Sequence, residues 1–393
     1  MAFDYCVHKL TGSVQHYSWG GTKFLPQLLT IENPNHAPFA EYWLGVHAGG
    51  PASVEVNQQS VLLSDIIASD PVAALSAPVY EQFGGLPYLF KVLDVKDMLS
   101  IQVHPTKEYA KVAFEKEEAA GVALDAPNRN YKDQNHKPEI MLAMSEFWLL
   151  HGFKSEAKIL ETLENSAEFQ VLAPLYKSEG LAGLYTFLME MEQAQVDSLL
   201  GPVIKRALRN KQDGKIDKTS PEWWVAKLYE NSNGIYPIDK GVFSIYLFNI
   251  VCIMPGQGIF QDAGVPHAYL EGQNVELMAN SDNVLRGGLT PKHIDIEELN
   301  PRILKVWSRY LHPEEFAIFD TTSIYDLTVA WTIKEALFKL NTKTGIDFKN
   351  DLRIKSKEGN TFLCEIKSED GFQTVKMETC AYKNLIISYN IKQ

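Results

Sequence analysis

The hydrophobic periodicity of this sequence changes twice along the chain, and this limits the folds that it can adopt. From Ser155 to about Leu228 the apolar residues recur at helical spacing. Two stripes are typical of helix faces that pack on a core: Val196, Leu199, Leu200, Val203 and Ile204, and then Leu181, Leu184, Leu188 and Met191. The flanking regions carry short apolar runs separated by turn residues. The pattern predicts a small all-α unit between two β-rich regions.

The β-rich regions contain short, partly alternating apolar segments with Gly and Pro between them. The segments expected to form strands are 88–93, 99–104, 242–254, 259–270, 316–319, 327–331, 362–366 and 385–389. We also expect a helix over 105–120 and short helical turns within 65–75. Many short strands at this spacing favour a β-sandwich or a jelly-roll barrel. The predicted fold class is therefore mainly β with an α-helical insert.

Charge and cysteine content exclude several classes of protein. The 393 residues include 37 Lys and Arg and 49 Asp and Glu, a net charge of −12, which disfavours binding to nucleic acid or to an anionic membrane. The longest apolar stretch, 242–254, is shorter than the roughly 20 residues of a transmembrane helix, and no signal peptide is visible. The cysteines form no C-x-x-C pair: Cys6, Cys252, Cys364 and Cys380. We therefore expect a cytoplasmic protein without disulfides or a thiolate zinc site.

Two polar clusters near residue 100 and residue 136 could supply metal ligands. Gln102 and His104 alternate on an expected strand, so their side chains point to the same face. A lone histidine at a strand end is the alternative. The run 133–139 is dense in polar groups and precedes an apolar segment, and Glu139 at its end could provide a carboxylate ligand. A solvated loop is the alternative there.

A third candidate ligand is His267, which follows Gly264-Val-Pro and leads out of a turn onto a strand. It could look into a barrel or be a structural histidine. Together Gln102, His104, Glu139 and His267 offer one amide oxygen, one carboxylate and two imidazoles. Zinc accepts such ligands and keeps an open position when it is catalytic. Iron, manganese and cobalt stay possible, and a two-histidine, one-carboxylate set also suits a non-haem iron oxygenase.

A fourth segment suggests the charge of the substrate. Glu276 lies on a strand-like piece, Arg286 precedes Gly287-Gly288, and Lys292 follows. The two glycines allow a backbone to pass close to a ligand. Arginine and lysine near a metal–carboxylate site favour an anionic substrate such as a sugar phosphate. A surface loop with ordinary salt bridges is the alternative.

With these segments in view, the sequence resembles the type I phosphomannose isomerase family of the cupin superfamily. The resemblance covers most of residues 10–140 and 240–310 and is weak elsewhere. The segments that carry it are Gln15-His-Tyr-Ser-Trp-Gly20, Ala40-Glu-Tyr-Trp-Leu-Gly-Val-His47, Ser100-Ile-Gln-Val-His-Pro105, Tyr131-Lys-Asp-Gln-Asn-His-Lys-Pro-Glu139, Gly264 to Leu270 and Glu276 to Lys292. The sequence departs from the family pattern at Ser18, at Thr106 and in the run 48–50, and none of these positions is a proposed metal ligand.

The resemblance implies two cupin-type jelly-roll barrels and a small all-α domain. The implied domains are a catalytic cupin domain with the metal site (1–153 and 233–310), a helical insert (154–232) and a C-terminal cupin-like β domain (311–393). It also implies a monomer whose partner is a phosphosugar, with no nucleic acid and no membrane.

The resemblance further implies one Zn²⁺ per chain on the four candidate ligands, with Arg286 as a catalytic residue. The pocket is implied to be lined by Trp19, Glu41, Lys137, Glu276 and Lys292. Lys91 and Ser100 are the implied phosphate-binding residues.

The implied reaction interconverts mannose 6-phosphate and fructose 6-phosphate through a cis-enediol(ate). The metal and Arg286 would polarise the substrate oxygens. Glu276 is the expected base, with His136 or a metal-bound water as the alternative, and Lys137 would stabilise the enediolate or orient the sugar. The rival functions are a non-haem iron cupin oxygenase and a non-catalytic sugar-binding cupin.

Overall fold

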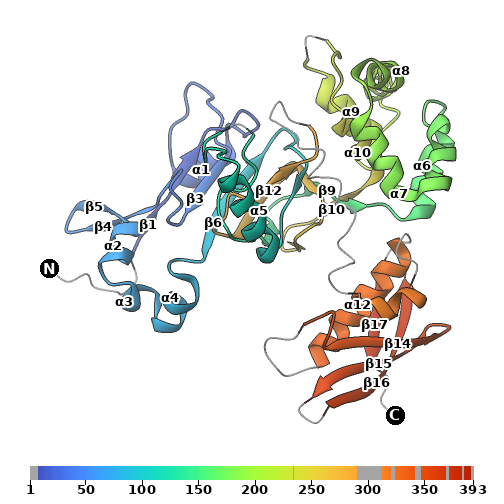
Figure 1. Cartoon of the computed structure of the whole chain (residues 1–393). Coiled ribbons are helices and arrows are strands. Elements are labelled where there is room, and N and C mark those ends of the chain that lie inside the picture. Colours follow the sequence, from blue (N-terminus) through green and yellow to red (C-terminus); the bar gives the residue numbers. More distant parts are fainter. Residues whose placement is uncertain are drawn as a thin grey trace. The chain divides into compact units, whose positions relative to one another are not determined.

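The computed structural model describes residues 8–126, 128–232, 234–289, 311–319, 324–340, 347–368, 371–382 and 385–390 (Figure 1). Contacts divide the chain into two compact units. Unit 1 comprises Met1–Phe153 and Met189–Leu299, and unit 2 comprises Lys154–Leu188 and Asn300–Gln393. Each unit is described separately below.

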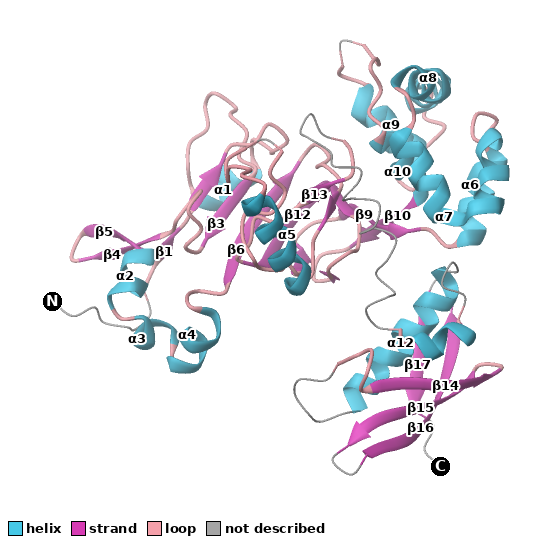
Figure 2. Cartoon of the chain, viewed as in Figure 1, coloured by secondary structure: helices cyan, strands magenta, loops and turns pink. Residues whose placement is uncertain are grey.

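A ten-stranded antiparallel sheet forms the centre of unit 1, with β12 (His267–Ala279) as its longest strand (Figure 2). The other members are β2 (Ser13–Gln15), β3 (Glu41–Leu44), β6 (Tyr88–Val95), β7 (Gln102–Val103), β8 (Glu139–Ala143), β9 (Phe147–Phe153), β10 (Phe248–Ile253), β11 (Gly258–Gln261) and β13 (Leu285–Arg286). The buried cluster on this sheet includes Leu93, Met141, Phe147 and Leu149. Most of the strands expected between 88 and 104 and between 248 and 270 are therefore present.

Strand β12 has different partners along its two halves. Its first half pairs with β7 and β9, and its second half pairs with β6 and β8. The register with β9 shifts between Tyr269 and Glu271, next to Gly272, which has φ 129°. Glycine tolerates this backbone, and a Cβ there would lie 2.7 Å from the carbonyl oxygen of Glu146. The strand thus bends at Gly272 and joins two groups of strands.

A separate three-stranded sheet and several short helices complete the N-terminal part of unit 1. The sheet has the order β1 (Leu10–Thr11), β4 (Ser53–Val56) and β5 (Gln59–Leu62). The helices are α1 (Phe24–Leu29), α2 (Leu63–Ser69), α3 (Pro71–Leu75), α4 (Ala77–Phe83) and α5 (Lys107–Ala119). Helix α5 begins after Thr106, whose hydroxyl accepts the N–H of Tyr109. The helical turns expected within 65–75 and the helix expected over 105–120 are both confirmed.

Helices dominate the middle of the chain, as the stripes predicted. Unit 1 contains α8 (Gln193–Gln212), α9 (Pro221–Tyr229) and α10 (Gly241–Leu247); unit 2 contains α6 (Glu156–Asn165), the short 3-10 helix η1 (Gln170–Leu172) and most of α7 (Ala173–Glu190). The strand expected from residue 242 is wrong up to residue 247, because α10 occupies these positions. All seven residues of α10 are buried. A segment that is apolar on every side has no helical stripe, so its periodicity cannot separate helix from strand.

The C-terminal part of unit 2 combines a helix with an antiparallel sheet. Strands β14 (Leu352–Glu358), β15 (Thr361–Ser368), β16 (Gly371–Tyr382) and β17 (Leu385–Asn390) pair in chain order. A 3-10 helix η3 (Pro313–Ala317) and α12 (Ile324–Leu340) precede them. The strands expected at 362–366 and 385–389 are confirmed.

Two other expected C-terminal strands are wrong. Residues 327–331 lie inside α12, and η3 covers the start of 316–319. The β-branched residues near 330 suggested a strand, but Val329, Ile333 and Leu337 repeat every four residues and are buried on one helix face. The second jelly-roll barrel expected over 311–393 is not confirmed, because the described strands form a simple four-stranded meander. The whole fold is a mixed α/β fold with several antiparallel sheets and a helical region. Among the described residues, no helix has the length and apolar character needed to cross a membrane.

Candidate zinc and substrate site

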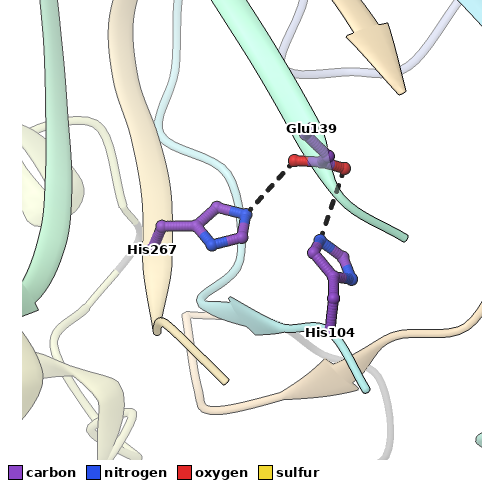
Figure 3. Close-up of side chains that lie close together, drawn as sticks. All are labelled: His104, Glu139 and His267. Carbon is purple, nitrogen blue, oxygen red and sulfur yellow. Dashed lines mark ion pairs between the residues drawn. The ribbon is translucent and has the colours of Figure 1, made fainter. Parts of the chain in front are cut away.

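Three buried side chains converge at one end of the large sheet in unit 1. His104 directly follows β7, Glu139 begins β8 and His267 begins β12. Their ligand atoms all lie within 4.8 Å of one another. Nε2 of His104 is 3.3 Å from Oε1 of Glu139, and Nε2 of His267 is 3.4 Å from Oε2 of the same carboxylate (Figure 3). Three separate strand ends therefore aim three metal-binding groups at one point.

The ring orientation of both histidines suits metal binding. Nδ1 of His104 lies 3.0 Å from the carbonyl oxygen of Asn283, and Nδ1 of His267 lies 2.9 Å from that of Val265. A carbonyl oxygen can only accept, so each Nδ1 donates its proton and each Nε2 keeps its lone pair toward the cluster. Burial lowers the pKa of His104 to about 4, which keeps the ring neutral near pH 7.

One nitrogen of this cluster faces Glu139 without a hydrogen bond to it. Nε2 of His104 is fully buried and makes no hydrogen bond within the described residues. A buried polar atom without a partner is costly, and a bound cation removes that cost. The donor set also fits: two neutral imidazoles and a carboxylate are ordinary zinc ligands. The residues present therefore fit a zinc ion.

The carboxylate of Glu139 is held in its ionised form. Burial alone raises its pKa, but the neighbouring Lys137 cation is the strongest opposing influence, and the pKa lies well below its usual range. Nζ of Lys137 lies 3.1 Å from Oε1 of Glu139. Gln102 lies directly opposite His267 in the β7–β12 register, and it lines the same cavity. The structure thus brings Gln102 beside the three-residue cluster.

A second group of buried charges lines this cavity. Nζ of Lys91 is 3.2 Å from Glu41 and 3.7 Å from Glu276. The Tyr269 hydroxyl donates to Oε2 of Glu276 at 2.7 Å, and Nε2 of Gln261 donates to the Tyr269 oxygen at 2.8 Å. The full lining is Glu41, Lys91, Leu93, Leu99, Gln102, Lys137, Glu139, His267, Ala268, Tyr269 and Glu276. Seven of these residues are sequence-predicted site residues.

Burial and neighbouring charges compete to set the protonation of Glu276 and Lys91. Burial and the nearby Glu139 raise the pKa of Glu276 to about 7, against the opposing effect of Lys91. Burial opposes the charge on Lys91, but Glu41 and Glu276 outweigh it and raise the lysine pKa. The cavity therefore combines a fixed cation with a carboxylate that can gain or lose a proton near neutrality.

Arg286 lies on β13, opposite the predicted metal ligand Gln102. It is half-buried, and burial lowers its pKa from the ordinary arginine value. Within the part of the chain that the structure describes, no hydrogen bond or ion pair holds its guanidinium. A half-buried cation of this kind can bind an anionic or polarised ligand oxygen.

Six predicted site residues are not among the cavity lining, and two of them, His104 and Arg286, are described above. Trp19 packs against the core of the large sheet and stacks on Tyr17, with ring centroids 5.8 Å apart. Ser100 is partly buried in the loop before β7. Burial lowers the pKa of His136, whose nearest charges include Lys107. Lys292 lies outside the described residues.

Sequence reasoning missed two supporting residues. Tyr269 was visible only as part of the His267 segment, two positions along the same strand. Asn283 is not among the predicted site residues, yet it is fully buried. Its side chain accepts the N–H of Lys132 at 2.7 Å and donates to the carbonyl oxygen of Asp133 at 2.7 Å, while its own carbonyl oxygen holds His104. A buried Asn in a turn gives no signal in a single sequence.

Comparisons with known proteins agree with this site. Residues 7–156 match the family described as phosphomannose isomerase type I, catalytic domain. The chain is 40% identical over 298 residues to the mannose-6-phosphate isomerase of Escherichia coli (strain K12), covering 75% of this chain and 73% of that protein. It is 38% identical over 318 residues to the mouse (Mus musculus) enzyme of the same name, covering 75% and 72% of the two chains.

Solved structures and a second family match extend the comparison. A crystal structure of mannose 6-phosphate isomerase from Salmonella typhimurium, bound to fructose 6-phosphate and zinc, superposes with a TM-score of 0.66 at 33% identity, covering 95% of this chain and 83% of that chain. Residues 294–388 match a different family, described as the 4'-phosphopantetheinyl transferase superfamily. The buried cluster, the two relatives and the solved structure together show that the chain belongs to the type I phosphomannose isomerase family.

Proposed function

We propose that this zinc-dependent mannose-6-phosphate isomerase works through a cis-enediol(ate), with the buried residues of the cavity in defined roles. The observation that carries the proposal is the convergence of His104, Glu139 and His267, with both Nδ1 atoms tied to carbonyl oxygens and both Nε2 atoms free to coordinate. Gln102 completes the ligand set, supported by its position opposite His267. Zinc supplies Lewis-acid polarisation of the substrate oxygens when it is bound.

Two cations of the chain would stabilise the negative charge that grows on the substrate. Arg286 stands opposite Gln102 and has no protein partner among the described residues, so its guanidinium can bind the oxygens of the enediolate. Lys137 lines the cavity and is 3.1 Å from Glu139, which places it beside the ligand set. It would stabilise the same charge or orient the sugar.

Glu276 is the proposed base that moves the proton between the two carbons. Its pKa of about 7 lets it accept and return a proton near neutral pH, and the Tyr269 hydroxyl fixes one of its oxygens. His136 is the alternative base. It is less well supported, because it is not among the cavity lining.

The remaining predicted residues would bind the substrate. Lys91 lines the cavity and is kept charged by Glu41, which suits a phosphate-binding cation. Ser100, Trp19 and Lys292 are retained as candidates from the sequence. Variants at these positions would raise KM for the phosphosugar more than they lower kcat.

The finer architecture is also a proposal. We infer that the strands around β12 form a cupin-type jelly roll, because β12 changes partners at Gly272 as a strand does when it passes between two sheets of a barrel. The proposed domains are 1–153 with 233–310, the helical insert 154–232 and the C-terminal 311–393. We propose a cytoplasmic monomer, which sedimentation would test.

A coupled assay tests the proposed function directly. Conversion of mannose 6-phosphate to fructose 6-phosphate is measured before and after a chelator, with metal analysis of the same sample. Loss of activity on chelation and its return with zinc are the expected results. A folded, fully metallated protein that does not isomerise the sugar would refute the function. Oxygen consumption with bound iron would instead support the oxygenase.

Replacing Arg286 by alanine separates its role from that of the ligands. Arg286→Ala should lower kcat about 10²- to 10³-fold, as the loss of one donor to a developing oxyanion does in other enzymes. The zinc content should not change, because Arg286 is not a ligand. Zinc loss in this variant would contradict the assignment.

A second candidate function concerns the C-terminal region. We infer that residues 294–388 carry a phosphopantetheinyl transferase activity, because this segment matches that superfamily, whereas the isomerase family model spans residues 7–156. The described residues of this region form a four-stranded meander and α12 and not the barrel that the isomerase resemblance implied. The reaction would move 4'-phosphopantetheine from coenzyme A to a hydroxyl of an acceptor protein, releasing adenosine 3',5'-bisphosphate.

This second function has its own test. The full chain is incubated with coenzyme A, Mg²⁺ and a purified acyl carrier protein, and the carrier is weighed by mass spectrometry. A mass increase equal to one phosphopantetheine group supports the proposal. An unmodified carrier, under conditions in which a known transferase modifies it completely, rejects this activity for that class of acceptor and leaves the isomerase unaffected.

A further inference from the structure

The turn after Arg286 is fastened to the helical region by a single carboxylate. Oδ1 of Asp239 accepts the backbone N–H of Leu289 at 2.9 Å and that of Gly241 at 2.7 Å. Gly241 is the first residue of α10, and Leu289 lies three residues beyond Arg286. Asp239 therefore joins the start of α10 to the segment that carries the proposed catalytic arginine.

Two glycines allow these backbone segments to touch. A Cβ on Gly288 would lie 2.5 Å from the Cα of Gly241, and a Cβ on Gly241 would lie 2.6 Å from the backbone nitrogen of Leu289. Leu289 itself has φ 58°, in the left-handed region that non-glycine residues rarely adopt. Such a backbone persists only where surrounding contacts hold it. The hydrogen bond from Leu289 to Asp239 is such a contact.

The start of the same turn is fastened to the strand that carries the metal ligands. The N–H of Gly287 donates to the carbonyl oxygen of Ile101 at 2.9 Å, and the N–H of Ile101 donates to Gly288 at 3.1 Å. These bonds extend the β7–β13 pairing, in which Arg286 faces Gln102. Among the described residues, none bonds to the guanidinium, and the backbone pairing of β13 with β7 is what holds Arg286 in place.

We propose that Asp239 is a positioning residue for Arg286. Its carboxylate locks the left-handed turn at Leu289 and so keeps the short strand β13 in register with β7, with Arg286 opposite Gln102. A flexible turn would let the guanidinium move away from the reacting oxygens, and a misplacement of about 1 Å can cost about 100-fold in rate. This inference rests on the proposed role of Arg286.

Asp239→Ala is the first test. The variant should lower kcat about 10- to 100-fold with little change in KM, because the turn is loosened while the substrate-binding residues remain. Zinc content should stay at the wild-type level. Asp239→Asn should recover most of the activity, because an amide oxygen can still accept both N–H groups. Asp239→Glu should not, because the extra methylene displaces the acceptor.

Asp217 provides a matched control. Its carboxylate also accepts the backbone N–H two residues ahead, that of Thr219 at 2.9 Å, in a turn before another helix of the same region. None of its described hydrogen bonds reaches the turn after Arg286. Asp217→Ala should therefore leave kcat unchanged. An equal loss in both variants would assign the effect to general damage of helix starts and overturn the proposal.

A double-mutant cycle decides whether Asp239 acts through Arg286. In the Arg286→Ala background, Asp239→Ala should cost less than about twofold, because the group that it positions is gone. The same large loss in both backgrounds would overturn the inference. Full activity of Arg286→Ala would instead remove the proposed role of the arginine itself. An impaired Arg286→Ala beside an unaffected Asp239→Ala would reject only the positioning role.

Discussion

Both units bury charged side chains, but they do so in different surroundings. In unit 1, Glu41, Lys91, Glu139 and Glu276 are each less than 9% exposed and line one cavity. In unit 2, Lys334 and Glu315 are 0% and 1% exposed and lie within an apolar core. Burial alone therefore does not separate a catalytic charge from a structural one.

The two regions differ in how completely their buried polar groups are hydrogen-bonded or ion-paired. Nζ of Lys334 lies 2.7 Å from Oε1 of Glu315 and also donates to the carbonyl oxygen of Phe348. Glu315 in turn accepts the backbone N–H groups of His312 and Ile354. This pair ties α12 to η3 and β14 with little bonding capacity left.

The catalytic cavity keeps bonding capacity unused. Nε2 of His104 has no hydrogen bond to any described residue, and the pKa of Glu276 lies near 7 because burial and like charges oppose its ionisation. A site that binds a metal and a substrate needs groups that the protein leaves unpaired. The metal cluster and the Lys334–Glu315 pair therefore differ in bonding capacity although both are buried.

The largest effect should follow from removing one ligand of the cluster of His104, Glu139 and His267. His104→Ala or His267→Ala removes one of the three converging ligands, so zinc content and isomerase activity should both be lost. Metal analysis of the purified protein and the coupled assay measure this. His16→Ala is the control: His16 is exposed and outside the cluster, so its variant should keep full zinc. Zinc retained at full occupancy in His104→Ala would contradict the ligand set.

Much of this cluster could be predicted from the sequence, for a physical reason. Gln102 and His104 lie two positions apart next to a strand, and Glu139 and His267 each begin one, so each residue carries a local signal of its own. Their convergence depends on how β7, β8 and β12 pair, which periodicity does not reveal. The resemblance to a known family supplied that long-range information.

The failures of prediction also have physical causes. Residues 242–247 form α10 because tertiary burial on every side erases the stripe that distinguishes a helix. The β-branched residues near 330 lie on α12, where packing overrides β propensity. Asn283 and Asp239 act through backbone groups far away in sequence, so neither has a local pattern.

The second-largest effect should come from replacing Glu276, the carboxylate whose pKa burial raises to about 7. Glu276→Gln removes the proposed base, so turnover should fall about 10²- to 10⁴-fold while zinc stays bound. Exchange of the substrate hydrogen with solvent should fall in parallel. Near-normal exchange in this variant would show that another group, such as His136, moves the proton.

The pH profile of the unmodified enzyme should show the same carboxylate. A base must be ionised to accept a proton, so kcat/KM should rise with pH. Burial raises the pKa of Glu276 to about 7, and the charge of bound zinc lowers it. The midpoint of the rise should therefore lie at or somewhat below pH 7. The rise should be absent from the residual activity of Glu276→Gln. A rise that persists unchanged would assign it to a different group.

Removing one member of the Lys334–Glu315 ion pair should lower the stability of the C-terminal region and leave the isomerase reaction unaffected. Lys334→Met leaves Glu315 buried without its cation, which should destabilise the C-terminal region by about 3–5 kcal/mol. Hydrogen exchange of the α12 and β14 amides measures the loss. The double variant Lys334→Met/Glu315→Leu should be much less destabilised, because no charge is stranded. Lys355→Met, which breaks only partly exposed contacts to Glu314 and Glu365, should change little. Equal damage from the single and double variants would contradict this.

The smallest effect should come from a charge cluster between these extremes. Glu271 on β12 is 31% exposed and bonds to both Lys218 and Lys227, which joins the α9 region to the large sheet. Burial opposes the charge of Glu271, but the two lysines outweigh burial and lower its pKa. The stabilisation by this carboxylate is therefore fully present above the unfolded-state pKa of about 4.3, and it is lost as the pH falls through the folded-state pKa. Glu271→Gln should destabilise this contact by about 1 kcal/mol at neutral pH.

Acid should abolish that difference, because protonated Glu271 no longer pairs with either lysine. Hydrogen exchange of α9 and β12 amides at neutral and at acid pH would measure it in the full chain. Asp213→Asn is the matched control, since Asp213 pairs at 2.8 Å with Lys215 where both side chains are largely exposed. The control should have almost no effect at either pH. A Glu271 effect as small as that control would show that partial burial adds nothing, and the boundary between structural and surface charge would then lie deeper in the fold, at pairs as enclosed as Lys334 and Glu315.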